Sequence, residues 1–279
     1  MKPLTPAIKQ YLHIKSQYPD SILFFRMGDF YEMFFEDAHI GSRELEIALT
    51  SRNKGQQDNV PLCGIPYHAA ETYLSKLLQK GYKVAICEQV EDPRLAKGIV
   101  KREVVRVFTP GLSMDPLRLG NSENHYLMSF CAEGEVFGLA FLDISTGAFR
   151  TCQISGFEPF LNEAFRNEPK EILTFKDFQQ HPCFERFKKV FEERLVNYRE
   201  DTLRKNYQSL TGIKTQFQIE NESDLQRSPL SALAAEMAFA YAKENQKTAL
   251  SHLQRPAFYQ IQDFMVVDET TKRNLELTQ

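Results

Sequence analysis

The sequence predicts a mixed α/β protein with two domains, and three observations lead to that prediction. The chain has 279 residues, which is enough to bury two modest hydrophobic cores. Short runs with the two-residue period of strands alternate with runs of helical period, a pattern typical of mixed α/β folds. Between the two halves, residues 109–121 are dense in turn formers, which favours a linker; these are Pro110, Gly111, Pro116 and Gly120.

The first half begins with a helix and then alternates strands with helices. Thr5 and Pro6 form a helix-start pair, and the apolar residues after them recur near helical spacing until Pro19. An apolar run then ends at Gly28, which predicts a strand followed by a turn. By the same criteria we expect further strands and helices; the strands are 22–26, 30–34, 47–51, 82–90 and 100–108, and the helices are 36–46 and 68–80.

The second half opens with three strand-like runs separated by short turns, which predicts an antiparallel meander over 126–131, 136–144 and 148–154. After the meander, helices over 157–165 and 228–244 alternate with short strands such as 171–175. The last segment starts a helix at Asp268 and contains no stop signal, as expected for a chain that is part of a longer protein. We therefore expect four segments: a first domain over 1–112, a linker over 113–122, a second domain over 123–262, and the start of a further domain over 263–279.

The composition excludes several classes of protein. No apolar run approaches the roughly 18 to 20 residues needed to cross a bilayer, and the N-terminus has no apolar core of a signal peptide, so we expect a cytoplasmic protein without a membrane partner. The five cysteines are odd in number and 20 or more residues apart. This spacing shows neither a disulfide framework nor a CxxC metal pair, and we expect mostly buried, reduced thiols.

The charge is distributed unevenly along the chain. The net charge is -3, but residues 1–120 carry 16 Lys and Arg against 14 Asp and Glu, whereas the remaining residues carry 18 against 23. Only the first half therefore suits a polyanion. Its densest cationic run lies between Arg94 and Arg106, which could contact phosphates or could equally be a solvated strand edge protected by charge.

The most informative block is Arg26 to Phe34, with the letters RMGDFYEMF. If the second part of this block is a strand, the two-residue period places Phe30 and Glu32 on one face and Tyr31 on the other. An aromatic wedge would then stand beside a carboxylate. The alternative is that Phe30 belongs to the core and Glu32 to the surface.

This block resembles the mismatch-recognition signature of the MutS family, in which the Phe of a Phe-x-Glu triplet does the reading. Five further blocks resemble that family in the same order, so the resemblance does not depend on one triplet. Together they cover nearly the whole chain: 61–69 (PLCGIPYHA), 84–89 (VAICEQ), 102–111 (REVVR and TPG), 142–147 (LDISTG) and 268–279 (DETTKRNLELTQ).

The resemblance implies that Phe30 stacks on a mispaired base from the minor groove and that Glu32 contacts the base. A mismatched step is already poorly stacked and easily bent, so inserting an apolar wedge there costs less than in paired duplex. A carboxylate among phosphates is repelled, and we hypothesise that Glu32 penalises intact duplex and is accommodated only at a displaced base. As phosphate contacts we select Arg52, Lys54, Arg102 and Arg106, on charge and block position alone.

For the second half, the resemblance implies the RNase H-like connector domain of MutS, with MutL as a partner and dimerisation of the full-length protein. ATP and Mg²⁺ belong to the full-length family; the chain has no GxxxxGK[ST] loop, and we expect no ATPase and no cofactor in it. Two alternatives remain. One is a non-enzymatic protein-interaction module with little DNA affinity, and the other is a nuclease using Asp143, which we interpret instead as a turn residue because no matching acids accompany it.

Overall fold

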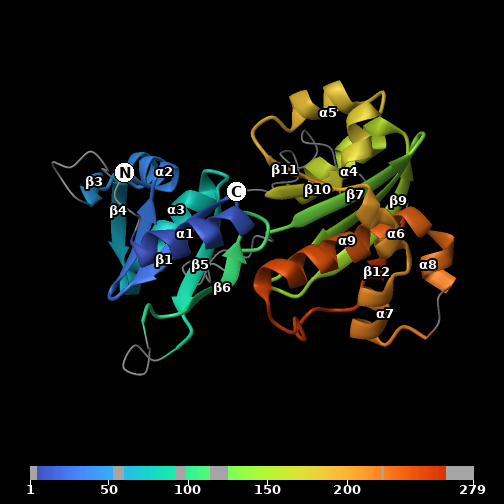
Figure 1. Ribbon diagram of the computed structural model, residues 1–279. Helices are drawn as coiled ribbons and strands as arrows, with labels where there is room; N and C mark the ends of the chain where they lie inside the picture. The colour runs from blue at the N-terminus through green and yellow to red at the C-terminus, as the bar shows by residue number, and fades with distance from the viewer. Residues whose placement is uncertain (1–4, 53–59, 92–97, 114–124, 221–222, 262–279) are drawn as a thin grey trace, which may run out of the picture.

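Two six-stranded mixed sheets, each covered by helices, make up the protein (Figure 1). A computed structural model describes residues 5–52, 60–91, 98–113, 125–220 and 223–261. The strand order is β3-β4-β2-β1-β5-β6 in the first sheet and β11-β10-β7-β8-β9-β12 in the second. The prediction of two mixed α/β domains is confirmed.

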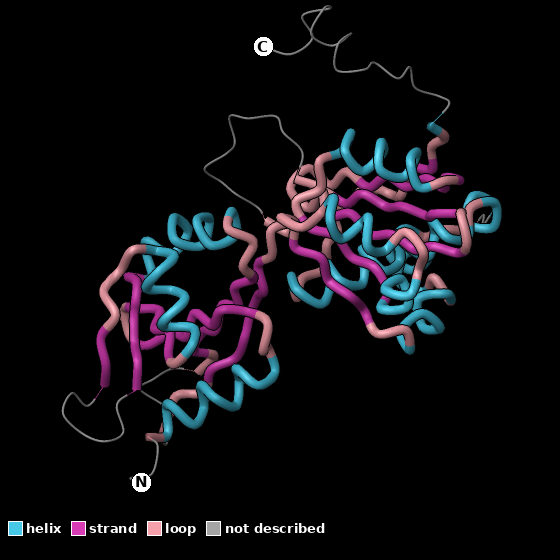
Figure 2. The backbone as a smooth tube through the Cα atoms, turned by 90° about the horizontal axis from the view of Figure 1, so that it is seen from above, coloured by secondary structure: helices cyan, strands magenta, loops and turns pink. Residues whose placement is uncertain are grey.

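The first sheet is the middle of three layers, with helices on both of its faces (Figure 2). One core cluster joins α1 to the sheet, and a second joins the sheet to α2 and α3. The elements, in chain order, are α1 (Pro6–Gln17), β1 (Ser21–Met27), β2 (Phe30–Phe34), α2 (Glu36–Leu45), β3 (Thr50–Arg52), β4 (Val60–Pro66), the 3₁₀ turn η1 (Tyr67–Ala69), α3 (Ala70–Gln79), β5 (Lys83–Gln89) and β6 (Arg102–Phe108).

Helix α1 begins where the sequence indicates, and a buried carboxylate holds it against the sheet. The Thr5 hydroxyl accepts a hydrogen bond from the backbone N–H of Ile8, and Pro6 occupies the first turn. Asp37, at the start of α2, accepts hydrogen bonds from the Tyr11 hydroxyl (2.6 Å), the Lys15 ammonium (2.8 Å) and the backbone N–H of Leu23 (3.0 Å). One side chain thus connects α1, α2 and β1.

The second sheet contains the predicted meander, because β7, β8 and β9 pair antiparallel in sequence order. Strands β10 and β11 then add in parallel beside β7, as expected for an RNase H-like sheet. The elements are β7 (Leu127–Glu133), β8 (Val136–Leu142), β9 (Phe149–Ser155), α4 (Phe157–Asn167), β10 (Glu171–Phe175), η3 (Lys176–Gln180), α5 (Phe184–Val190), β11 (Leu195–Arg199), α6 (Thr202–Gln208), α7 (Thr211–Phe217), α8 (Ser223–Arg227), α9 (Pro229–Gln246) and β12 (Ala257–Phe258).

Helix α9 is the central helix of the second domain. Thirteen of its residues are buried, and it packs on one face of the sheet while α4 and α5 cover the other. The approach is close at Gly138 on β8, where a Cβ atom would lie 2.1 Å from the backbone carbon of Leu230. Any larger residue at Gly138 would push α9 off the sheet.

The two domains meet at a hydrogen-bonded junction. Glu171 is fully buried and accepts hydrogen bonds from the Thr109 hydroxyl and from the backbone N–H of Gly111 (2.9 Å). Lys247, just after α9, donates to the carbonyl of Val104 (2.6 Å). Leu112, which the sequence assigned to the end of the first domain, lies in the core of the second. The connection is therefore packed against the second domain at its start.

Several elements differ from the expected bounds. The apolar run at 47–51 predicts a strand, but pairing begins only at Thr50, because Glu46 ends α2 in a left-handed conformation and the next residues stay largely exposed. The short helices α5 to α8 were not predicted, since their five to seven residues carry too little periodicity. The helix expected after Asp268 lies outside the described residues.

Two expectations from composition can be compared with the structure. Four of the five cysteines are buried and all five are free thiols, as expected; burial raises the pKa of Cys63 to about 12. Of the helices that the structure describes, none is long and apolar enough to span a bilayer.

Candidate nucleic-acid interface

Phe30 stands at the tip of a tight hairpin. Gly28 and Asp29 form the two-residue turn between β1 and β2, and Gly28 has φ +59°, which a first-position glycine adopts at no steric cost. Phe30 is the first residue of β2 and pairs with Met27 and with Pro66. Its side chain is 48% exposed. The alternative that Phe30 is a core residue is therefore wrong.

The strand period orders the side chains of β2 as the sequence indicates. Tyr31 and Met33 belong to the core under α2 and α3, whereas Phe34 belongs to the core under α1. Phe30 and Glu32 therefore share the α1 face, near the end of the sheet. Glu32 is half-buried and lies opposite Gly64 on β4, whose missing side chain leaves room beside the carboxylate.

Arg26 supports this hairpin from the opposite face of the sheet. Its guanidinium carbon lies 3.8 Å from the ring centroid of Tyr67, its Nε donates to the carbonyl of Gly28 (2.5 Å), and it lies 3.7 Å from the carboxylate of Glu88. The Tyr31 hydroxyl donates to the same carboxylate, and burial raises the pKa of Tyr31. The turn that presents Phe30 is thus held by a charged and aromatic cluster.

The sequence reasoning missed this cluster. The signal was the strand alternation, because Arg26 pairs directly with Tyr31 and the parallel register between β1 and β5 places Glu88 beside them. Tyr67 could be found only through folding: it lies more than 30 residues after β1 and β2, and its backbone N–H donates to the carbonyl of Asp29 (3.0 Å). Its ring is 44% exposed, so a second aromatic surface lies near Phe30.

The structure does not bring together the three phosphate candidates that it describes. Arg52 ends β3, opposite Val60, whereas Phe30 is opposite Pro66 at the far end of the same strand β4. Six residues of strand separate the two ends by about 20 Å. Arg106 lies half-buried on β6, the opposite edge of the sheet from β3, and Lys54 lies outside the described residues.

Arg102 is the candidate that the structure uses internally. It is only 8% exposed, and its guanidinium donates to the carbonyl of Arg26 (2.7 Å), the side-chain oxygen of Gln10 (3.0 Å) and the carbonyl of Val100 (2.9 Å). Burial lowers its pKa, with Glu32 acting in the opposite direction. Arg102 therefore joins α1, β1 and β6, and has few donors left for a phosphate.

The connection between β5 and β6 leaves the sheet at the end that carries Phe30. Phe25 pairs with Glu32 and with Cys87, and Gln89 pairs with Arg102, so the last residues of β5 run alongside the hairpin. Of the cations near this connection, Lys101 is described; it is exposed and forms an ion pair with Glu103 at 2.6 Å. Arg94 and Lys97 lie outside the described residues.

In the second domain, Asp143 is the residue that raised the nuclease alternative. It is fully buried, and its carboxylate accepts hydrogen bonds from the backbone N–H groups of His125, Ser145 and Thr146 and from the Ser145 hydroxyl. Its oxygens are engaged by the turn after β8, as a turn residue requires. Within the described ranges, no three His, Cys, Asp or Glu side chains are grouped so as to hold a metal ion.

Two family models match the chain in tandem. The model for MutS domain I matches residues 5–116, and the model for MutS domain II matches residues 125–254. A solved structure of a Fowlpox virus resolvase with Holliday junction DNA aligns over 43% of the chain at 11% identity, with a TM-score of 0.32, which is too low to support an argument.

Curated relatives match the chain over its whole length. It is 43% identical to the DNA mismatch repair protein MutS of Acetivibrio thermocellus over 100% of the chain and 32% of that protein. It is 45% identical to the MutS of Alkaliphilus metalliredigens, again over 100% of the chain and 32% of the relative, and 42% identical to that of Geobacillus thermodenitrificans, over 100% and 29%. The chain thus spans about a third of the length of these relatives. With both domain models and full-length coverage of the chain in agreement, the chain belongs to the MutS family.

Proposed function

We propose that this chain recognises mispaired or unpaired bases in duplex DNA, with Phe30 as the wedge that stacks on the displaced base from the minor groove. The observation that carries the proposal is an aromatic ring, 48% exposed, on a hairpin braced by Arg26. An exposed benzyl group on a rigid turn is suited to entering a base step. Stacking on an aromatic ring stabilises by about 1 to 3 kcal/mol whichever base is present, so one residue serves many mispairs.

The energetic selectivity comes from the DNA. Separating a base step costs a few kcal/mol, and bending a site of this size costs on the order of 1 to 6 kcal/mol more. Both costs are smaller at a mismatch, while the stacking gain from Phe30 is the same. The domain therefore senses how easily the duplex deforms, and reads sequence only weakly.

Glu32 sharpens this selectivity in our proposal. It lies on the same face as Phe30 and is half-buried, so a groove that admits the ring also meets the carboxylate. Repulsion from phosphates opposes insertion into intact duplex, and a displaced base offers the carboxyl group a hydrogen-bonding partner. For backbone contacts we retain Arg52, Lys54 and Arg106 as candidates and omit Arg102, whose donors are used within the domain.

The partners suggested by the family belong to the same proposal. The second domain would contact MutL, and the full-length protein would dimerise around DNA and use ATP with Mg²⁺. The relatives are named for DNA mismatch repair and are about three times as long as this chain. Because the candidate phosphate contacts of the first domain are few, we expect this chain to bind DNA weakly, with a shallow salt dependence, and we expect tight binding to depend on the rest of the protein.

The decisive test is a fluorescence anisotropy titration at low salt with a G·T or single-base-bulge duplex against its matched parent. We expect the chain to prefer the mismatched duplex and Phe30→Ala to lose that preference, because the wedge is removed. Phe165→Ala is the matched control, since Phe165 is 54% exposed on α4 of the second domain. Equal binding of all duplexes by all three proteins would favour the interaction-module alternative.

Glu32→Gln tests the role of the carboxylate separately. It removes the charge and keeps the shape of the side chain. We therefore expect tighter binding of matched duplex, and a smaller ratio between the affinities for mismatched and matched duplex. Glu36→Gln removes the same charge from an exposed position on α2 and serves as the control. If Glu32→Gln binds matched duplex no more tightly than the Glu36→Gln control, repulsion by Glu32 is not part of the recognition.

A further inference from the structure

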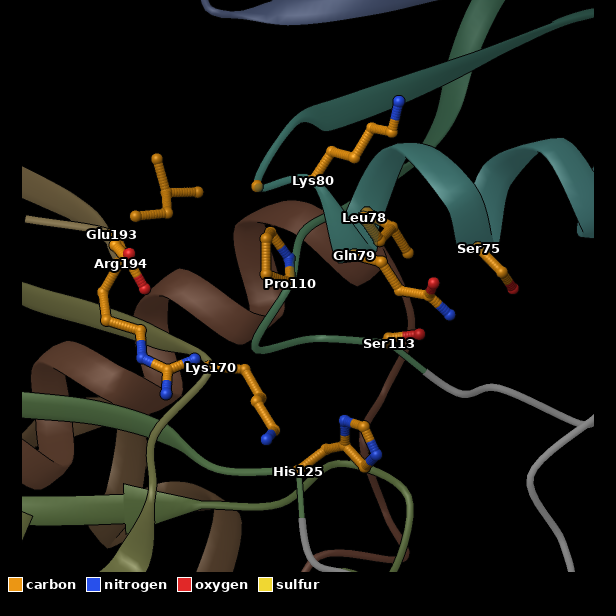
Figure 3. A pocket seen from close by; sticks show the side chains of 12 residues that line it. Ser75, Leu78, Gln79, Lys80, Pro110, Ser113, His125, Lys170, Glu193 and Arg194 are labelled. Carbon is orange, nitrogen blue, oxygen red and sulfur yellow. The ribbon is translucent and has the colours of Figure 1, made fainter. Parts of the chain in front are cut away.

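A cleft of about 320 Å³ lies between the two domains (Figure 3). It is bounded by the end of α3, by the connection after β6, and by the starts of β10 and β11. The cleft is far from the proposed DNA site. Gly81, which lines the cleft, comes just before β5, and Lys83 at the start of β5 pairs with Ser21 at the start of β1. Phe30 pairs with Met27 at the other end of β1. Six residues of strand put about 20 Å between the two places.

Two cations enter this cleft side by side. The parallel register pairs Glu171 with Leu195, so the residues before them, Lys170 and Arg194, are neighbours at the same end of the second sheet. Figure 3 shows both side chains directed into the cleft, with the ring of His125 close to Lys170. Neither Lys170 nor Arg194 forms an ion pair with any residue that the structure describes. Adjacent like charges without an anion between them repel each other.

Their backbones are fixed, so the two charges cannot easily move apart. The N–H of Lys170 donates to the carbonyl of Tyr126 (2.9 Å), and the N–H of Arg194 donates to the carbonyl of Phe191 (3.0 Å). Lys80, on the opposite wall, behaves differently. Its ammonium is turned away from the cleft (Figure 3) and pairs with Glu44 at 2.9 Å.

The first domain and the connection contribute neutral hydrogen-bonding groups. Ser75 and Gln79 line the cleft from α3, and Ser113 lines it from the connection. No Phe, Tyr or Trp is among the described lining residues, so the lining offers no ring for a nucleobase to stack on other than the imidazole of His125. The volume is near the lower limit of small-molecule pockets, about 300 Å³. A compact, highly charged ligand fits these features better than a nucleoside.

We propose that this cleft binds a small, freely diffusing oxyanion of the polyphosphate class. Arg194 would hold it through its planar fork of N–H donors, Lys170 would supply a second charge, and Gln79 and Ser113 would bond it from the facing side. Because both domains line the cleft, the bound anion stabilises the orientation in which they surround it. The site is separate from the proposed DNA contact at Phe30.

The test is isothermal titration calorimetry of the whole chain with sodium pyrophosphate at low ionic strength. We expect Arg194→Gln and Lys170→Gln each to weaken binding at least about tenfold, since each removes a charge-assisted hydrogen bond. Glu193→Gln should tighten binding, because it removes the one carboxylate among the described lining residues. Circular dichroism checks that these exposed or half-exposed substitutions leave the fold intact.

Matched controls separate a built site from general charge. Arg255→Gln and Lys188→Gln remove the same charges at exposed positions outside the cleft, and should bind pyrophosphate like the parent. No binding by the parent, or equal losses in the controls, would overturn the proposal. So would displacement of pyrophosphate by matched duplex DNA together with weaker duplex binding by Arg194→Gln, which would assign the cleft to DNA phosphates. Phe30→Ala should retain pyrophosphate binding, which keeps this outcome independent of the mismatch proposal.

Discussion

The two domains each contain a buried carboxylate with several donors, and the two networks differ in what they connect. Asp37 in the first domain accepts hydrogen bonds from the Lys15 ammonium, the Tyr11 hydroxyl and the N–H of Leu23, all within its own domain. Glu171 in the second domain accepts hydrogen bonds from neutral donors. Two of these donors, the Thr109 hydroxyl and the N–H of Gly111, belong to the connection to the first domain. The first network stabilises a domain, and the second fixes how the domains meet.

The difference in partners also has an energetic meaning. A cation that bonds a buried carboxylate directly compensates its charge, whereas a buried carboxylate with only neutral donors depends mainly on their hydrogen bonds. The other two donors to Glu171 are the side chains of Asn197 (2.7 Å) and Tyr241 (2.6 Å). Burial accordingly raises the pKa of Glu171, with these hydrogen bonds acting in the opposite direction.

The largest expected effect comes from breaking the first network. Asp37→Ala removes the acceptor that the half-buried Lys15 ammonium, the Tyr11 hydroxyl and the N–H of Leu23 share, and should lower the free energy of unfolding of the first domain by about 2 to 4 kcal/mol. Urea unfolding with hydrogen-exchange mass spectrometry, which reports on β1 and β7 separately, measures this loss. The control is Glu103→Ala, which removes an exposed ion pair with Lys101 in the same domain and should lower the free energy of unfolding far less, because solvent screens exposed charges.

A smaller effect is expected at the junction. Glu171→Gln replaces one acceptor oxygen by a donor, so the free energy of unfolding should fall by about 1 to 3 kcal/mol, and small-angle scattering should show a wider range of interdomain orientations. Glu236→Gln is the matched control, because Glu236 accepts from the N–H groups of Gly212 and Ile213 within the second domain. If Glu236→Gln widens the range of interdomain orientations as much as Glu171→Gln does, Glu171 does not fix how the two domains meet.

The same variant gives a pH signature. The pKa of Glu171 is raised in the folded chain, so its contribution to stability is fully present below the unfolded pKa of about 4.3 and is lost as pH rises through the folded value. Glutamine does not titrate. The stability advantage of the parent over Glu171→Gln should therefore decline between pH 4 and neutrality, and an advantage that grows with pH would contradict the raised pKa.

The smallest effect should come from Lys247, which bonds the carbonyl of Val104 and the hydroxyl of Tyr18 from the end of α9. Lys247 has φ +53°, so Lys247→Gly removes these bonds without adding backbone strain. We expect the free energy of unfolding to fall by about 1 kcal/mol, and the range of interdomain orientations in small-angle scattering to widen slightly. Gln218→Gly relieves a similar φ of +50° within the second domain and should leave the orientation unchanged.

The site was predictable where local geometry decides it. The alternation of β2 correctly placed Phe30 and Glu32 on one face, and the Gly28 turn was visible in the block RMGDF. The cations were not predictable in this way. Arg102 lies in a basic stretch and was selected as a phosphate contact, yet it bonds Gln10, which is 92 residues away. A long side chain can reach many partners, and its charge alone does not say which one it meets.

By itself, the sequence determined the mixed α/β class, the family and the face of the sheet that carries Phe30 and Glu32, because periodicity and ordered blocks are properties of the chain. Tertiary structure alone decided which arginine is buried, which carboxylate joins the domains, and that Lys170 and Arg194 face a shared cleft. These features arise where strands and helices distant in sequence are brought together. Burial and hydrogen bonding depend on all the neighbours in space, and the order of residues along the chain does not specify them locally.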